Sequence, residues 1–435
     1  MMRSLFSAVS GLKAHQTKFD VSGNNIANVN TVGYKSQSAT FSDVFYQTTQ
    51  SASGANAETG KGGSNPRQIG LGSAIGSITT NMESQGSPES TGNPYDLMIN
   101  GSQFFIIDNN GETCFTRAGN FVKDVDGALV TASGSHVLGW QVDDDGNVIK
   151  DKVSAVYVGG TKFEKTSPAA TTSASVSGNI SAANTDDVTF TVNFYDSLGN
   201  EYQATLTASY DAQNSQNGVV SYSITGGSVT KNSQPTTLTV SCDKSFQFNS
   251  TTGKAISDVM SSLQLQITGG DDVANIGTNS GNTSTINFDA TKVTYYASDS
   301  KLIGAKGIDG KGTGKPVGTM TAVGIDTSGR IVANYSNGDI KTIGQVAVAS
   351  FSNPAGLEKV GENLYRATMN SGEFDGIGED VSTNGSMKSS YLEMSNVDLA
   401  QEFTQMIITQ RGYQANSRVI TVSDTLLEEL INLKR

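Results

Sequence analysis

The amino-acid sequence predicts a mainly β protein with an α-helix at each end of the chain. Helical spacing of apolar residues is confined to about the first 28 and the last 40 residues, while the interior consists of short apolar runs separated by Gly, Asn and Asp turns. The composition agrees, because 48 glycines and only 16% charged residues favour short strands and many turns.

Apolar residues at the N-terminus recur with the spacing of a heptad repeat. Two sets seven residues apart interleave up to Ile26, and the Asn-rich stretch GNNIANVNTVGYK should then end the helix. This pattern is typical of a coiled-coil helix, so we expect one face to contact other helices in an assembly. The expected interface residues of this helix are Leu5, Val9, Leu12, Gln16, Phe19 and Ile26.

The C-terminal segment from about residue 396 predicts a longer helix with two apolar stripes. Ser395 or Asn396 can cap its start, and Lys434 and Arg435 suit the negative end of its dipole. Two stripes require neighbours on more than one side. The expected interface residues here are Leu399, Phe403, Met406, Gln410, Arg411, Tyr413, Ile420, Leu427 and Ile431. A second stripe runs through Ile408, Gly412, Ala415, Val419, Val422, Leu426, Leu430 and Leu433.

The interior predicts nested β domains, with a middle domain built from two chain halves and an outer domain inserted between them. Alternating runs such as LMINGSQFFIID and IVANYSNGDIKTIGQVAVASF mark the two halves. The expected divisions are an N-terminal helix over 1–28, a connecting segment over 29–70, a middle domain over 71–149 and 317–390, an insertion over 150–316 and a C-terminal helix over 391–435.

Composition excludes several classes of partner. The formal charge of −12 does not suit a surface that neutralises phosphates, so we expect no nucleic acid. We also expect no cleaved signal peptide and no membrane-spanning segment. Cys114 and Cys242 lie far apart in sequence and lack metal-ligand spacing; two free thiols are expected, and one disulfide between them stays open.

Residues suited to catalysis are scarce. The two histidines, His15 and His136, fall in a predicted helix and a predicted strand, and neither has a triad pattern around it. Residues 143–147, DDDGN, resemble the start of a calcium loop but lack the Glu at its twelfth position. The glycine-rich strings GLGSAIG and GKGTGKP lack the spacing of nucleotide loops. We therefore expect no catalytic residues, no metal and no cofactor, and the protein should not be an enzyme.

Both ends of the chain resemble one protein family. Residues 10–45 resemble the N-terminal segment of the flagellar rod and hook family, and residues 395–435, with the run QRGYQ, resemble its C-terminal helix. Three interior segments are also similar to the family: 194–200, 335–338 and 343–357. The N-terminal family motif comprises Asn24, Asn25, Ala27, Asn28, Asn30, Thr31, Gly33, Tyr34 and Lys35.

The resemblance implies an axial flagellar protein that is exported unfolded, without a cleaved signal peptide, and polymerises helically into a tube. The terminal helices would line the channel and the insertion would face outward. The large insertion favours the hook, a curved, bendable universal joint outside the cell that transmits motor torque to the filament. The implied partners are other copies of the chain, the distal rod protein, the hook cap, the hook–filament junction proteins and the flagellar type III export apparatus.

Three alternatives stay open at this point. A distal rod protein of the same family would share both terminal motifs. A β-rich surface adhesin or binding module would have the same Ser, Thr and Asn content, although terminal heptads are not typical of it. Finally, the two helices could simply form one intramolecular pair that packs on the β domain.

Overall fold

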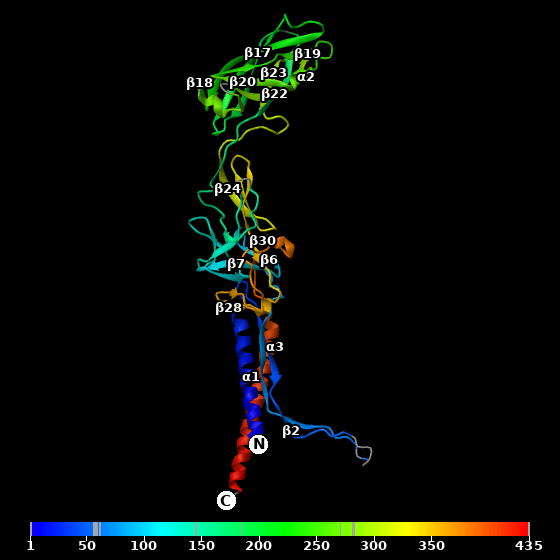
Figure 1. Cartoon of the computed structure of the whole chain (residues 1–435), viewed down its shortest axis with the longest axis vertical. Coiled ribbons are helices and arrows are strands. Elements are labelled where there is room, and N and C mark those ends of the chain that lie inside the picture. Colours follow the sequence, from blue (N-terminus) through cyan, green and yellow to red (C-terminus); the bar gives the residue numbers. More distant parts are fainter. Residues whose placement is uncertain are drawn as a thin grey trace. The chain divides into compact units, whose positions relative to one another are not determined.

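The computed structural model describes residues 2–54, 60, 62–143, 146–183, 185–269, 271–280 and 283–433. Asp144 and Asp145 of the acidic turn, and Lys434 and Arg435 at the end of the chain, lie outside these ranges. A long helix stands at each end and strands fill most of the described interior, so the expected fold class is confirmed (Figure 1).

The chain divides into two compact units. Unit 1 comprises Met1–Gly160, Val323–Val332 and Lys341–Arg435, and unit 2 comprises Thr161–Ala322 and Ala333–Ile340. Strands β24 (Gly318–Ile325), β25 (Arg330–Tyr335) and β26 (Ile340–Val346) each run from one unit into the other. The finer division expected from the sequence stays a prediction.

Unit 1 contains both long helices, α1 (Met2–Ala27) and α3 (Leu399–Asn432), which lie side by side and run antiparallel (Figure 1). The predicted cap of α3 is wrong. Asp398 is the N-cap, because its carboxylate accepts hydrogen bonds from the amides of Ala400 and Gln401 at 2.8 and 3.2 Å. Asn396 is held elsewhere, by Ser36 and Asn81.

Two strand pairs follow α1. Strand β1 (Gln37–Asp43) pairs antiparallel with β4 (Ser73–Thr80), with a register shift at Thr40, and both contact α1. Strand β2 (Tyr46–Gln50) pairs with β3 (Arg67–Gly70), and every residue of these two strands is exposed.

The middle sheet of unit 1 joins strands from both halves of the chain, in the order β26-β11-β7-β8-β29-β28. Its core packs Phe104, Phe115, Trp140 and Tyr365, all nearly inaccessible to solvent. Its strands and their neighbours are β5 (Pro88–Ser90), β6 (Leu97–Gly101), β7 (Phe104–Asn109), β8 (Glu112–Thr116), β9 (Val122–Lys123), β10 (Leu129–Val130), β11 (His136–Trp140), β12 (Ser154–Ala155), β27 (Val348–Ala349), β28 (Glu358–Gly361), β29 (Leu364–Arg366), β30 (Gly385–Ser389) and β31 (Tyr391–Glu393), with 3₁₀ turns Pro354–Gly356 and Val381–Thr383.

Unit 2 is built around a sheet in the order β15-β16-β17-β18-β20-β22-β14-β23. The outermost strands β15 and β23 contact each other, so the sheet curls around a core that includes Phe190, Phe246 and Phe288. Its elements are β13 (Lys165–Thr166), β14 (Ser173–Ser181), β15 (Val188–Tyr195), β16 (Glu201–Tyr210), β17 (Val219–Lys231), β18 (Gln234–Cys242), β19 (Phe246–Asn249), α2 (Ser257–Met260), β20 (Leu263–Thr268), a 3₁₀ turn Asp271–Asn275, β21 (Thr278–Ser280), β22 (Thr283–Tyr296) and β23 (Lys301–Lys306).

Candidate functional site

A buried ion cluster lies where the two helices meet the middle sheet. The carboxylate of Glu393 accepts hydrogen bonds from Nζ of Lys35 at 2.8 Å, from Nε of Arg117 at 3.0 Å and from the amide of Gly86 at 3.0 Å. The three charged side chains are no more than 2% exposed. Residues far apart in sequence are thus tied together just beyond the end of α1 and just before the start of α3.

This cluster holds two cations and one carboxylate, so backbone carbonyls accept the remaining donors. Lys35 donates to the carbonyl oxygen of Ser84 at 2.7 Å, and Arg117 donates to those of Gly101 and Gln103. Burial lowers the pKa of Lys35, and the charge of Glu393 opposes that shift only in part. Removing the carboxylate would leave two buried cations with no counter-charge, which is strongly unfavourable.

Gly33 of the family motif occupies a position that only glycine fits. Its φ of 68° is left-handed, and a Cβ atom there would lie 2.5 Å from the amide nitrogen of Ala118. Its own amide donates to the carbonyl oxygen of Glu393 at 2.7 Å. The chain can therefore leave α1 and press directly against the middle sheet.

Asn25 uses its whole side-chain amide to fix the end of α1. Its Oδ1 accepts from the amide of Gln37 at 2.9 Å and from the Tyr34 hydroxyl at 3.1 Å, while its Nδ2 donates to Gln37 O and to Glu402 Oε1, each at 2.8 Å. Asn25 is completely buried. Of the motif, Asn25, Gly33, Tyr34 and Lys35 are buried, Asn28 and Thr31 half-buried, and Asn24, Ala27 and Asn30 exposed.

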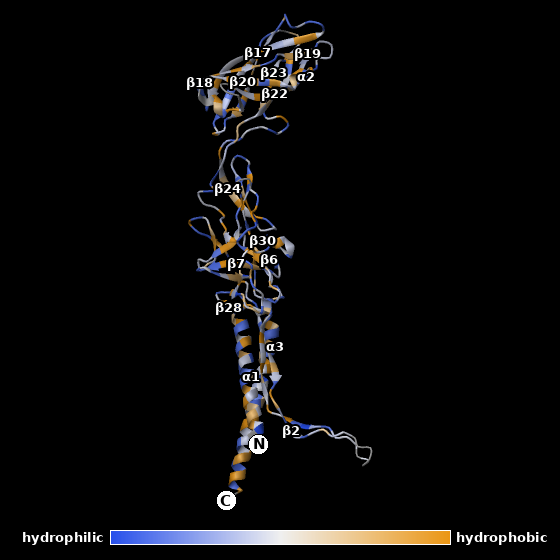
Figure 2. Cartoon of the chain, in the orientation of Figure 1, coloured by the Kyte–Doolittle hydropathy of each residue, from blue (hydrophilic) through white to orange (hydrophobic). Residues whose placement is uncertain are grey.

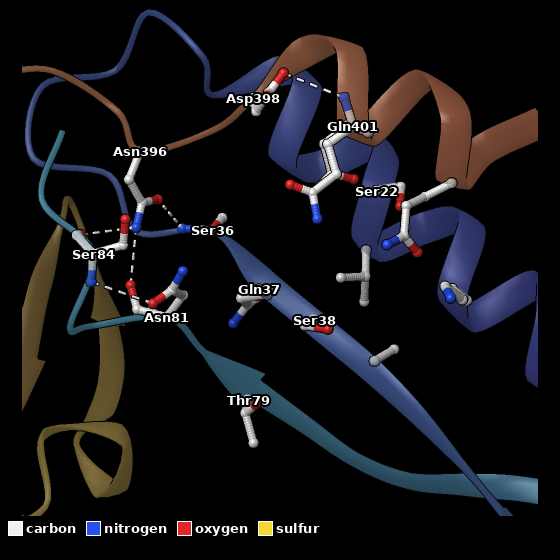
Figure 3. Close-up of a pocket in the computed structure, with 15 residues that line it drawn as sticks. Ser22, Ser36, Gln37, Ser38, Thr79, Asn81, Ser84, Asn396, Asp398 and Gln401 are labelled. Atoms are coloured by element: carbon white, nitrogen blue, oxygen red, sulfur yellow. Dashed lines mark hydrogen bonds between the residues drawn. The ribbon is translucent and has the colours of Figure 1, made fainter. Parts of the chain in front are cut away.

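A polar cleft lies beside this junction, between the end of α1, the start of α3 and strands β1 and β4 (Figure 3). Asn396 spans its edge, accepting from the amide of Ser36 at 2.7 Å and donating to the carbonyl oxygens of Asn81 and Ser84 at 3.0 and 3.1 Å. The segment leading into α3 is thus fixed to both strands before the helix begins.

The contact between α1 and α3 is made by polar and small residues. Nδ2 of Asn25 donates to Glu402, the His15 ring stands over Gly412, and the Asn416 side chain fills the space beside Gly11. From one pair to the next, the residue number rises along α1 by the same amount as it falls along α3. All three pairs therefore belong to one antiparallel register. Among the described residues, α1 fully buries Ala8, Gly11, Ala14, Ser22 and Asn25, and α3 fully buries Thr409 and Ser423.

Many apolar residues of the predicted heptads lie away from this seam, whereas Ile420, between Asn416 and Ser423 on the seam face, is half-buried. Phe19 is 42% exposed and Phe403 is 51% exposed. The half-buried members of the predicted interface are Leu5, Val9, Leu12, Ile26, Met406, Ile420 and Leu427. The exposed members are Gln16, Phe19, Leu399, Phe403, Gln410, Arg411, Tyr413 and Ile431. No predicted interface residue of either helix is fully buried within the chain by itself.

The second stripe of α3 is exposed as well, apart from Gly412, which faces His15 in the seam, and orange segments mark its C-terminal part in Figure 2. Ile408 is 64% exposed and Leu433 is 80% exposed. The α3 side of the seam does follow a seven-residue repeat in the sequence. Because its residues are polar, a search for apolar periodicity does not detect it: Glu402, Thr409, Asn416 and Ser423.

The remaining candidate residues form no reactive centre in the part of the chain that the structure describes. No three His, Cys, Asp or Glu side chains gather there as metal ligands would, and no helix there is long and apolar enough to span a membrane. Cys114 and Cys242 are both free thiols. Asp143 closes a turn by accepting from the amide of Asn147 at 2.7 Å, and His136 lies half-buried on β11.

Comparison with known proteins matches these same segments. Three family descriptions match: "Flagella basal body rod protein" over residues 5–35, "Flagellar hook protein FlgE/F/G D1 domain" over 98–182, and "Flagellar basal body rod FlgEFG protein C-terminal" over 388–433. The flagellar hook proteins of Borreliella burgdorferi and Treponema pallidum are 38% and 34% identical to this chain, each over 100% of both chains. The flagellar basal-body rod protein FlgG of Bacillus subtilis is 32% identical, also over 100% of both.

The chain therefore belongs to the flagellar hook protein family, whose members are structural proteins of the flagellum and not enzymes.

Replacing Glu393 with Gln should destabilise unit 1 by about 3 to 5 kcal/mol, because Lys35 and Arg117 would stay buried without a counter-charge. The single tryptophan, Trp140, lies in the core of unit 1, so its fluorescence during urea unfolding reports on that unit. Glu112→Gln is the matched control, since it breaks an exposed ion pair with Arg366 in the same unit and should cost under about 1 kcal/mol. Equal losses for both variants would contradict the role of the cluster.

Replacing Gly412 with Ala should weaken the helix pair by about 1 to 3 kcal/mol, because the added Cβ would lie 2.5 Å from the His15 ring. Alanine favours an isolated helix, so a loss must come from packing. In a double-mutant cycle, adding His15→Ala to Gly412→Ala should recover most of the stability that Gly412→Ala loses.

Gly23→Ala serves as the control for that cycle, because a Cβ at Gly23 meets nothing within 4 Å. That substitution should be neutral or slightly stabilising. If Gly412→Ala behaves like Gly23→Ala in circular dichroism melts, the close approach of the helices is wrong.

Proposed function

We propose that this chain is the structural subunit of the flagellar hook and that copies of it assemble through the apolar faces of α1 and α3. One observation carries the proposal: the two helices pair through polar and small residues and leave every large apolar side chain described on them at least partly exposed. Helices stable by themselves normally turn the apolar stripe inward. Here that stripe is free to contact other copies, as a self-assembling subunit requires.

The amount of uncovered surface is sufficient to drive assembly. Burying one large apolar side chain contributes about 1.5 to 3 kcal/mol, and ten or so exposed apolar residues lie along α3. Because they surround the helix, one neighbouring copy cannot cover them all. A helical polymer, in which each subunit has several neighbours, satisfies this requirement. In the separate subunit we expect these helices to be less ordered than in the tube.

The hook is favoured over the rod by similarity. The two relatives named as hook proteins are 38% and 34% identical, against 32% for the relative named as a rod protein. Chain length does not separate the two, since the rod relative also aligns over its whole length. In the hook, the polar surfaces between the apolar contacts would let neighbouring subunits shift as the tube bends and transmits torque.

The remaining assignments follow from membership of the hook. The assembled protein would be an extracellular part of the flagellum, exported by the type III apparatus without a cleaved signal peptide. Its partners would be other copies of itself, the distal rod protein at one end, and the hook cap and the hook–filament junction proteins at the other. The predicted family motif would act inside the subunit, by fixing the helix pair to the middle sheet.

The double variant Leu12→Asp, Phe19→Asp should not form tubes, although its β units should stay folded, because the two new carboxylates would place charge on the assembly face. Sedimentation and electron microscopy would detect tubes, and Trp140 fluorescence would verify folding. Met369→Asp is the control, since Met369 is 99% exposed and lies outside the helices. Normal tubes from the double variant would refute the assignment of this face.

A further inference from the structure

His15 is wedged between two elements in the seam of the helix pair. On one side its ring stands against the backbone of α3, where a Cβ at Gly412 would lie 2.5 Å from Cε1 and 2.6 Å from Nε2. On the other side it meets Phe41 of β1 edge-on, with ring centroids 5.2 Å apart. The ring thus contacts both α3 and β1.

The ring nitrogens are poorly placed to carry a second proton. Nδ1 is buried and has no hydrogen-bond partner. A neutral imidazole can leave one nitrogen as an unused acceptor, whereas an imidazolium carries N–H groups on both nitrogens and needs acceptors for both. Creating a buried donor with no partner disfavours the charged form.

The charged groups around His15 do not reverse this preference. On α1, Lys18 places its ammonium 5.4 Å from the centroid of the same Phe41 ring, and Asp20 lines the cavity of about 420 Å³ beside His15. On α3, Tyr413 lines that cavity and Arg411 stands two residues before it. Strand β1 ends in Asp43, and β4 has no charged residue. Burial first, and the Lys18 charge second, lower the pKa of His15 below 6.5.

We propose that His15 makes the α1–α3 pair a proton-sensitive latch, closed while the imidazole is neutral and loosened when it is protonated. The sign follows from linkage. Because the pKa of His15 is lower in the pair than in the separated helices, the separated helices bind the proton more readily. The pair therefore keeps its full stability above about pH 6.5 and loses stability as the pH falls from there toward the lowered pKa.

The latch can be tested in the subunit before any tube forms, so the result does not depend on the proposed function. In the full chain labelled at histidine only, NMR should show two imidazole signals, and His136→Gln identifies which belongs to His15. The His15 signal should titrate below 6.5. Hydrogen exchange of α3 amides, corrected for intrinsic rates, should increase between about pH 7.5 and pH 5.5, up to about tenfold for each unit by which the pKa is lowered.

His15→Gln should abolish this pH response of α3, and His136→Gln, which removes the other histidine, should retain it. Lys18→Met gives an independent measurement, because loss of its charge should move the His15 titration and the exchange transition together toward higher pH. A His15 signal that titrates at 6.5 or above would overturn the latch. So would an α3 that is unprotected at both pH values, or a response to acid that survives in His15→Gln.

Discussion

The organisation of unit 1 depends on one buried carboxylate. Glu393 ends β31, shortly before α3, and its two cationic partners, Lys35 and Arg117, come from the segment after α1 and from the residue that follows β8 of the middle sheet. The Gly33 amide adds a bond to the backbone of the same residue. Because these groups are fully buried, none can leave without exposing an unpaired charge to the protein interior. The cluster therefore fixes the exit of one helix and the entry of the other on the same rigid support.

The helix pair itself separates two functions that a simple coiled coil combines. Glycines at Gly11 and Gly412 each accept a side chain from the opposite helix, which fixes the register without much apolar burial. The apolar residues remain available on the outer faces. A pair held by polar contacts and shape can tolerate small adjustments, whereas the non-directional hydrophobic contacts would, in the proposed assembly, be made with other copies of the chain.

Sequence periodicity was enough to predict both helices, the strand-rich interior and the apolar faces, because these depend on local spacing. It did not identify the seam, since a repeat of Glu402, Thr409, Asn416 and Ser423 carries no hydrophobic signal. The N-cap was predicted at Ser395 or Asn396, before the true cap Asp398, because Asn396 is equally suitable locally but its side chain bonds to Ser36 and Asn81 instead. The cluster around Glu393 joins residues hundreds of positions apart, and only the folded chain brings them together.

The central claim is that the terminal helices, and not the β units, assemble the protein. The most direct measurement compares the full chain with residues 30–397 by sedimentation and electron microscopy under polymerising conditions. The shorter chain keeps Lys35, Arg117 and Glu393 together, so Trp140 fluorescence should show unit 1 folded. We predict tubes from the full chain and a folded monomer from the shorter one. Tubes from both, or a full chain that stays monomeric under polymerising conditions, would contradict this account.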